Sequence, residues 1–171
     1  MTAIATHRTA LKWAFELLEM TMAGVTQEQA DWPPPGNANS ISATYAHAVC
    51  ALDGVVNGLF RGGAPLFATS WAGKTGVSDP QIISTPEWAR SVRLELDRAR
   101  AYAQAAYADL DAYIAGLSET DLARELDLSM AGLGTRTLDW CLSALVTGHL
   151  NNMAGEISCL KGIQGAKGYP F

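Results

Sequence analysis

The residues of this chain best suited to chemistry are two histidines that lie far apart in the sequence. His149 and Met153 are four positions apart, so a helix places both on one face, one turn from each other. His47 lies inside a second predicted helix. Imidazoles on neighbouring helices can bind one metal ion, and a histidine at position 153 would complete a three-histidine site. Methionine at that position indicates a metal site that has been altered.

Other interpretations of these residues stay open. The pattern alone favours His47 and His149 as core histidines that hydrogen bond to each other or to a tyrosine. Cys50, three residues after His47, could supply a thiolate ligand for zinc or copper. The thioether of Met153 would suit Cu(I) better than zinc, although methionine is more often a core filler.

The predicted last helix carries an apolar stripe on the same face as His149, so we expect His149 and Glu156 to point inward. Glu156 is two turns beyond His149, about 10.5 Å of helix rise, which is too far to share one ion. We therefore predict that Glu156 is a hydrogen-bonding group beside whatever fills the cavity. Thr44, one turn before His47, is also expected beside this cavity.

Helical periodicity and end signals predict the elements that position these residues. A first helix ends near Gly24, a second covers residues 41–59, and a fourth begins near residue 135 or 137. A third begins at Thr85-Pro86-Glu87 and has a coiled-coil-like stripe that alternates steps of four and three, namely Val92, Leu96, Ala99, Ala103, Ala106, Leu110, Tyr113 and Leu117. Residues 61–85 form a long connection without helical periodicity, and connections of this length are often binding loops or lids. Four helices with one long connection predict an all-α four-helix bundle, a single domain over residues 1–171.

The small residues Ala99 and Ala103 allow two arrangements. They let a neighbouring helix approach closely, or they leave room for a pocket.

Composition excludes several classes of function. The formal charge of −5 is spread along the chain, so neither nucleic acid nor an anionic membrane is an expected partner. The 3 cysteines show no paired spacing, which argues against a disulfide framework. No apolar run is long enough for a membrane span and no leader is apparent, so we expect a cytoplasmic protein.

A further set of motifs is specific in its order and spacing. It comprises Leu17-Leu18, the run Gly24–Gln29, the run Pro35–Ile41, His47, the run His149–Ile157 and the ending Leu160–Phe171. In these motifs the chain resembles the DinB-like (DinB/YfiT) superfamily of four-helix bundles over essentially its whole length. The resemblance implies an up-down-down-up bundle with a long crossover between the second and third helices, and a homodimer.

The resemblance also implies a divalent metal, zinc or nickel, bound by one histidine of the second helix and an i,i+4 histidine pair of the fourth. His47 and His149 match two of these ligands, and Met153 departs from the third, which leaves copper as a further candidate. The relatives that are enzymes are transferases or isomerases that use low-molecular-weight thiols such as bacillithiol or mycothiol. In such enzymes the metal would lower the thiol's pKa and hold the thiolate as nucleophile.

Two functions follow from these observations. Because position 153 lacks its histidine, we favour a metal-free or weakly metal-binding dimeric bundle that is structural or binds a small ligand, in a pocket lined by Ala99 and Ala103. The alternative is a divalent-metal-dependent thiol S-transferase or isomerase with His47 and His149 as ligands, in which Cys50 could replace the missing one.

Overall fold

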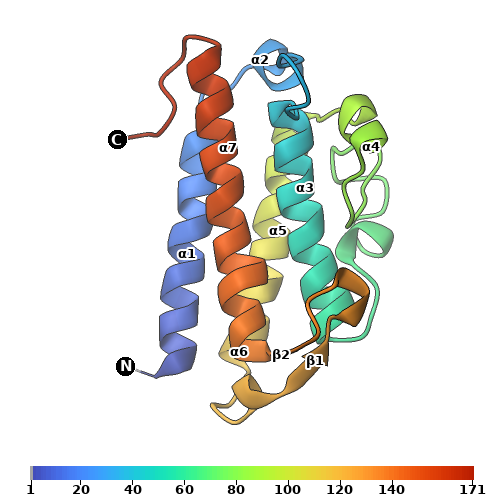
Figure 1. Cartoon of the computed structure of the whole chain (residues 1–171), viewed down its shortest axis with the longest axis vertical. Coiled ribbons are helices and arrows are strands. Elements are labelled where there is room, and N and C mark those ends of the chain that lie inside the picture. Colours follow the sequence, from blue (N-terminus) through green and yellow to red (C-terminus); the bar gives the residue numbers. More distant parts are fainter. Residues whose placement is uncertain (1) are drawn as a thin grey trace.

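Four long helices form the body of the molecule (Figure 1), and the computed structural model describes residues 2–171. They are α1 (Ala3–Met22), α3 (Ile41–Asp53), α5 (Leu96–Ala115) and α7 (His149–Ile163). α1 and α7 run in one direction and α3 and α5 in the other, with the long crossover between α3 and α5 (Figure 1). The all-α, up-down-down-up bundle expected from the sequence is confirmed.

Hydroxyl side chains begin several of these helices. Thr2, Ser40 and Thr137 each accept a hydrogen bond from the backbone amide three residues later, in front of α1, α3 and α6 (Leu138–Cys141) respectively. Such caps satisfy amides that a helix leaves unpaired at its start. The short α2 (Gln27–Asp31) has a full capping box between Thr26 and Gln29. The predicted starts of the second and fourth helices therefore agree with the structure.

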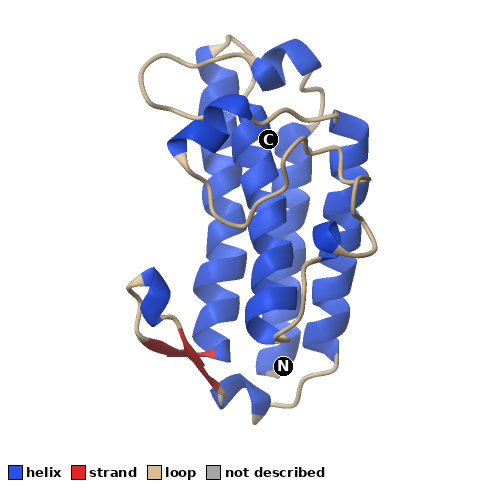
Figure 2. Cartoon of the chain, turned by 90° about the vertical axis from the view of Figure 1, so that its right-hand side faces the viewer, coloured by secondary structure: helices blue, strands red, loops and turns tan. Residues whose placement is uncertain are grey.

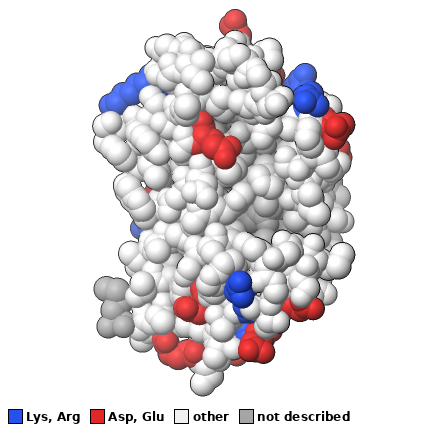
Figure 3. Space-filling model, viewed as in Figure 1, with Lys and Arg blue, Asp and Glu red and all other residues white. Residues whose placement is uncertain are grey.

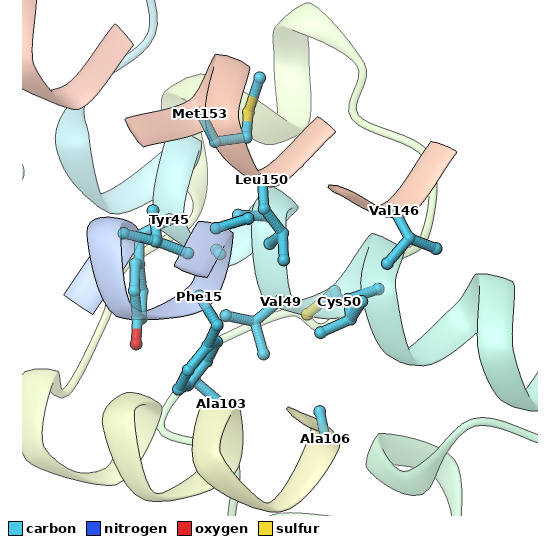
Figure 4. Packing of buried hydrophobic residues seen from close by; sticks show 14 of the residues in the cluster. Phe15, Tyr45, Val49, Cys50, Ala103, Ala106, Val146, Leu150 and Met153 are labelled. Atoms are coloured by element: carbon cyan, nitrogen blue, oxygen red, sulfur yellow. The ribbon is translucent and has the colours of Figure 1, made fainter. Parts of the chain in front are cut away.

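The core lies on the axis of the bundle. α1 packs against α7 and α5, and α3 packs against the same two helices. Figure 4 shows side chains from these helices meeting, with Phe15 of α1 beside Ala103 of α5 and Leu150 of α7 above Val49 of α3. Because Ala99 and Ala103 are fully buried in this cluster, they serve close helix approach, the first of the two expected arrangements.

The predicted third helix is divided in two, so the prediction of one continuous helix is wrong. α4 (Pro86–Ser91) ends at Val92, which has an extended conformation with φ −62° and ψ 139°. Residues 92–95 then pair with the crossover, through a bridge between Val77 and Leu94 and a hydrogen bond from the Glu95 amide to the Gly76 carbonyl. These long-range hydrogen bonds replace a turn of helix that the local periodicity favours.

The long crossover is attached to α3 by one buried carboxylate. Asp53 accepts hydrogen bonds from the backbone amides of Leu66 and Phe67, which begin the 3₁₀ turn η2 (Leu66–Ala68). It also accepts from the Tyr102 hydroxyl and from the side-chain amide of Asn57. Figure 2 shows the crossover running along the outside of the bundle. Four donors on a single carboxylate fix an otherwise irregular segment.

A small hairpin lies at one end of the bundle beside α6 (Figure 1). Strands β1 (Glu125–Asp127) and β2 (Thr135–Thr137) are antiparallel, with Leu126 opposite Arg136. The 3₁₀ turns η3 (Asp121–Ala123) and η4 (Ser129–Ala131) lie before and within the hairpin. Among residues 2–171, no helix combines the length and the apolar character needed to cross a membrane.

Candidate functional site: a histidine pair at an apolar cavity

The two interior histidines come together at the middle of the bundle. His47 lies on α3 and His149 is the first residue of α7, and these helices pack antiparallel against each other. The ring centroids are 4.9 Å apart and the ring planes are nearly perpendicular, at 89°. The predicted inward orientation of His149 agrees with this geometry.

Both helices widen next to the histidine pair. α3 continues into the π-helical segment η1 (Gly54–Phe60), and His149 directly follows a second one, η5 (Leu142–Gly148). π-helical turns are rare and often occur at functional sites. The sequence gives no sign of them beyond the two glycines Gly54 and Gly58, which the structure places in η1.

The widened helices and two loops line an open cavity of about 750 Å³. In the view of Figure 3, charged side chains lie mostly towards the two ends of the molecule, and the surface between α7 and α3 is hollowed. No Lys, Arg, Asp or Glu lines the cavity, whose walls consist of His47, Ala51, Gly54, Val55, Gly58, Leu59, Ile82, Ile83, Ser84, Leu128, Ala131, Leu133, Ala144, Leu145, His149 and Asn152. Its volume is that of a site for a drug-sized molecule.

Polar atoms without partners lie at the histidine pair and one turn before it on α3. Within residues 2–171, neither imidazole makes a hydrogen bond, and His47 Nδ1 and His149 Nε2 are fully buried and unpaired. The Thr44 hydroxyl, one turn before His47, is also buried and unpaired. Buried polar groups are nearly always paired, since an unpaired one costs about 1–3 kcal/mol. Buried polar atoms without a partner are therefore concentrated around the histidine pair.

Burial keeps both imidazoles neutral. It lowers the pKa of His47, and it lowers the pKa of His149 to about 4, to which the neighbouring His47 also contributes. A neutral imidazole has one donor and one acceptor nitrogen, so each ring can serve in either role. At neutral pH the site is consequently polar but uncharged.

Met153 does not line the cavity. Its side chain is 9% exposed and belongs to the core, beyond Leu150 (Figure 4). Because α3 and α7 run antiparallel, Met153 lies level with Thr44, one turn from the level of the histidine pair. The methionine thus fills core volume at the position where the family pattern has a ligand.

Cys50 is directed elsewhere in the core. Burial raises the pKa of its thiol to about 12, and it lies beside the Tyr102 hydroxyl and the backbone of Gln81. Cys50 is not part of the cavity wall. A thiol in these surroundings stays protonated and is a poor metal ligand, because the thiolate is the binding form.

The remaining predicted residues lie apart from the pair. Glu156 is exposed and outside the cavity wall, so its predicted inward orientation is wrong; desolvation nevertheless raises the pKa of its carboxyl. It lies one helical turn beyond Asn152, a cavity residue that the sequence analysis missed. His7 lies at the end of the bundle, as expected, where its Nε2 is 2.8 Å from an oxygen of Asp139.

The residues present do not fit the three-ligand metal centre that the family pattern implies. His47 and His149 supply two nitrogens, but Met153 and Cys50 both lie in the core and off the cavity wall. No group of three His, Cys, Asp or Glu side chains among residues 2–171 is arranged to hold a metal ion. Catalytic zinc typically keeps three protein ligands and one open position.

A second cavity lies at the other end of α3. It has a volume of about 820 Å³ between the 31–40 loop and α4, with Arg90 and Arg93 in its wall. None of the predicted site residues reaches it.

The four-helix bundle, its long crossover and the two histidines between its helices are typical of one class of all-α proteins. In that class the binding site is formed by side chains on facing helices. The profile of the DinB superfamily matches residues 10–155, and the chain belongs to that family. A solved structure, described as the conserved protein of a locus from Enterococcus faecalis, is similar with a TM-score of 0.81 and 20% identity, over 96% of this chain and 99% of that one. At that identity the likeness concerns the fold. A search of curated proteins found no match.

Proposed function

We propose that this DinB-superfamily protein binds a small molecule in the cavity beside His47 and His149 and does so without a resident metal ion. The observation that supports this most is that the three positions that bind the metal in the family pattern do not all lie at one place. Two of them meet at an apolar cavity, while the third holds a methionine packed in the core. A cavity that keeps its volume and its polar base but lacks a third ligand is suited to binding more than to metal catalysis.

Elemental analysis of untagged protein, with the Met153→His variant beside it, tests the proposal. We expect well below one metal ion per chain in the unchanged protein after exposure to zinc, nickel or copper. The variant restores the i,i+4 histidine pair and should bind close to one ion. Met153→Leu is the matched control, because it removes the thioether, keeps a core residue and adds no ligand.

The alternative function, a metal-dependent thiol S-transferase or isomerase, is supported by the same two imidazoles, since neutral, unpaired ring nitrogens are what a divalent ion requires. Stoichiometric metal in the unchanged protein that is lost on His149→Ala would favour that function and overturn our proposal. Metal in neither protein would leave the metal-free function in place and show that the bundle no longer keeps the geometry of the third ligand.

We also propose that the protein is a cytoplasmic homodimer. The support for a dimer is apolar surface outside the cavity, above all Trp13 and Met20, which are 49% and 38% exposed and lie seven residues apart on one face of α1. Large exposed apolar side chains on one helix face are typical of association surfaces. The support for the location is that all 3 cysteines are free, as expected in a reducing compartment.

A further inference from the structure

The surroundings of the histidine pair indicate which kind of molecule the cavity selects. This inference rests on the proposed function, because it assumes that the cavity binds a ligand. We infer that the ligand is an uncharged, largely apolar molecule with one hydroxyl group, and that His47 and His149 hold this hydroxyl. The argument depends on the cavity wall, on the atoms at its base and on the segment that covers it.

The wall disfavours a charged ligand. It contains no charged side chain, and most of its residues are aliphatic, with Leu59, Leu145 and Ile82 among them. A ligand carboxylate or ammonium would lose its hydration and find no opposite charge on the wall. Apolar contact, in contrast, is available on several sides, so the body of the ligand should be hydrocarbon-like or aromatic.

The base requires one group that both donates and accepts. His47 Nδ1 and His149 Nε2 have no access to solvent, so the ring atoms left to meet a ligand are Nε2 of His47 and Nδ1 of His149. With one ring donating and the other accepting, the pair matches a hydroxyl, which has one donor and two acceptor lone pairs. The rings are close enough, at 4.9 Å between centroids, for one small group to meet both.

The crossover supplies the apolar cover. Ile82 lies so close to Gly54 that a Cβ on Gly54 would come within 2.4 Å of Ile82 Cγ1. Ile83 beside it is 74% exposed and also lines the cavity. The chain just before these residues is held in place, because the Trp88 indole donates a hydrogen bond to the Asp79 carbonyl. Ile82, which packs on Gly54 of η1, would therefore contact the hydrocarbon body of the ligand, while the two histidines would contact its hydroxyl group.

Three probes of similar size separate these features. They are naphthalene, 2-naphthol and 2-naphthoate, which present no polar group, a neutral hydroxyl and an anion on the same ring system. Fluorescence titration at pH 7 should give a dissociation constant for 2-naphthol about tenfold lower than for naphthalene, as expected for two added hydrogen bonds. The anion should bind more weakly than 2-naphthol by at least as much.

The His149→Phe variant identifies the groups that hold the hydroxyl. It should bring the dissociation constants for 2-naphthol and naphthalene to within about twofold of each other, because the ring shape is kept and one hydrogen bond is lost. His7→Phe is the matched control; it makes the same substitution at the bundle end and should keep the tenfold difference. Circular dichroism of each variant shows whether the fold is retained.

The outcomes separate this inference from the proposed function. Equal binding of naphthalene and 2-naphthol to the unchanged protein would overturn the inference and leave an apolar pocket whose base is satisfied by water. Preferential binding of 2-naphthoate would overturn it as well, because the site would then select an anion. Failure of all three probes to bind would contradict the proposed function itself.

Discussion

The imidazole rings of His47 and His149 stand perpendicular to each other with their centroids 4.9 Å apart, each on a helix that is π-helical close by. No carboxylate lines the cavity that they share. The pair is therefore held neutral by burial, and a proton added to either ring has no partner in the cavity wall to stabilise it.

Acid should therefore destabilise the fold through His149. Its folded-state pKa of about 4 lies below the usual 6.5, so between these values the unfolded chain binds a proton that the folded chain does not. The contribution to the free energy of unfolding is complete above about pH 6.5 and is lost as the pH falls towards 4. We expect a loss of about 1–3 kcal/mol in urea unfolding of metal-free protein across this window, from 1.4 kcal/mol per pKa unit.

Carboxylates also titrate in part of this window, so variants are needed to assign the effect. The His149→Phe variant should lose much less stability between pH 6.5 and 4 than the unchanged protein. An unchanged slope in His149→Phe would show that other groups cause the acid sensitivity.

Gly54 and Gly58 offer a matched pair of substitutions in the cavity wall. A Cβ at Gly54 would meet Ile82 Cγ1 at 2.4 Å, whereas nothing lies within 4 Å of one at Gly58. Gly54→Ala should therefore displace Ile82 and cost about 1 kcal/mol or more of stability. Gly58→Ala should be stabilising by about 0.5–1 kcal/mol, since glycine is unfavourable within a helix.

The double variant Gly54→Ala/Ile82→Ala assigns the cost of the first substitution to its contact. A double-mutant cycle in urea unfolding should give a coupling of at least 0.5 kcal/mol, because removing the Ile82 side chain also removes the overlap. Purely additive effects would mean that the alanine strains the π-helical backbone and not the crossover.

The sequence predicted the fold well because its signals are local. Ser40 and Thr137 accept hydrogen bonds from amides in their own helices, and such starts can be read from a few neighbouring residues. The break at Val92 was missed because it depends on pairing with Gly76 and Val77, which lie well back along the chain. Glu156 was misplaced because it follows His149 by two turns of the regular helix α7, and periodicity shows the shared face but not where along the helix that face becomes exposed.

The site was predictable only in part for a similar reason. The histidine pair follows from helix spacing, but Ile82 and Ile83 reach the cavity on an irregular crossover whose path is set by a remote carboxylate, Asp53. Asn152 could have been suggested by its position one turn after His149. Nothing local marks residues 128–133 as part of the wall.

The buried Asp53 should be a large determinant of stability. It accepts hydrogen bonds from the Tyr102 hydroxyl, the Asn57 amide and two amides of the crossover. Asp53→Ala leaves these donors unpaired in a buried place and should cost about 3–5 kcal/mol. Tyr102→Phe removes only one donor and keeps the ring, so its cost should be about 1–2 kcal/mol, as measured by urea unfolding.

Limited proteolysis distinguishes loss of this anchor from general destabilisation. Cleavage within residues 61–85 should become much faster in Asp53→Ala than in Tyr102→Phe, under conditions in which both variants remain folded. Equal cleavage rates in the two variants would contradict the role of the carboxylate in holding the crossover.

The exposed face of α1 allows a direct test of the proposed dimer. A glutamate at position 13 would place a charge where an apolar side chain, 49% exposed in the single chain, is expected to be covered by a second copy. Trp13→Glu should therefore raise the dimer dissociation constant at least tenfold in sedimentation velocity. Ile83→Glu is the matched control, an equally drastic change at a 74% exposed residue on the crossover, and should leave the dimer intact. If Trp13→Glu left the dimer unchanged and Ile83→Glu caused dissociation, the interface would instead lie at the mouth of the cavity. A partner chain there would restrict access to the histidine pair.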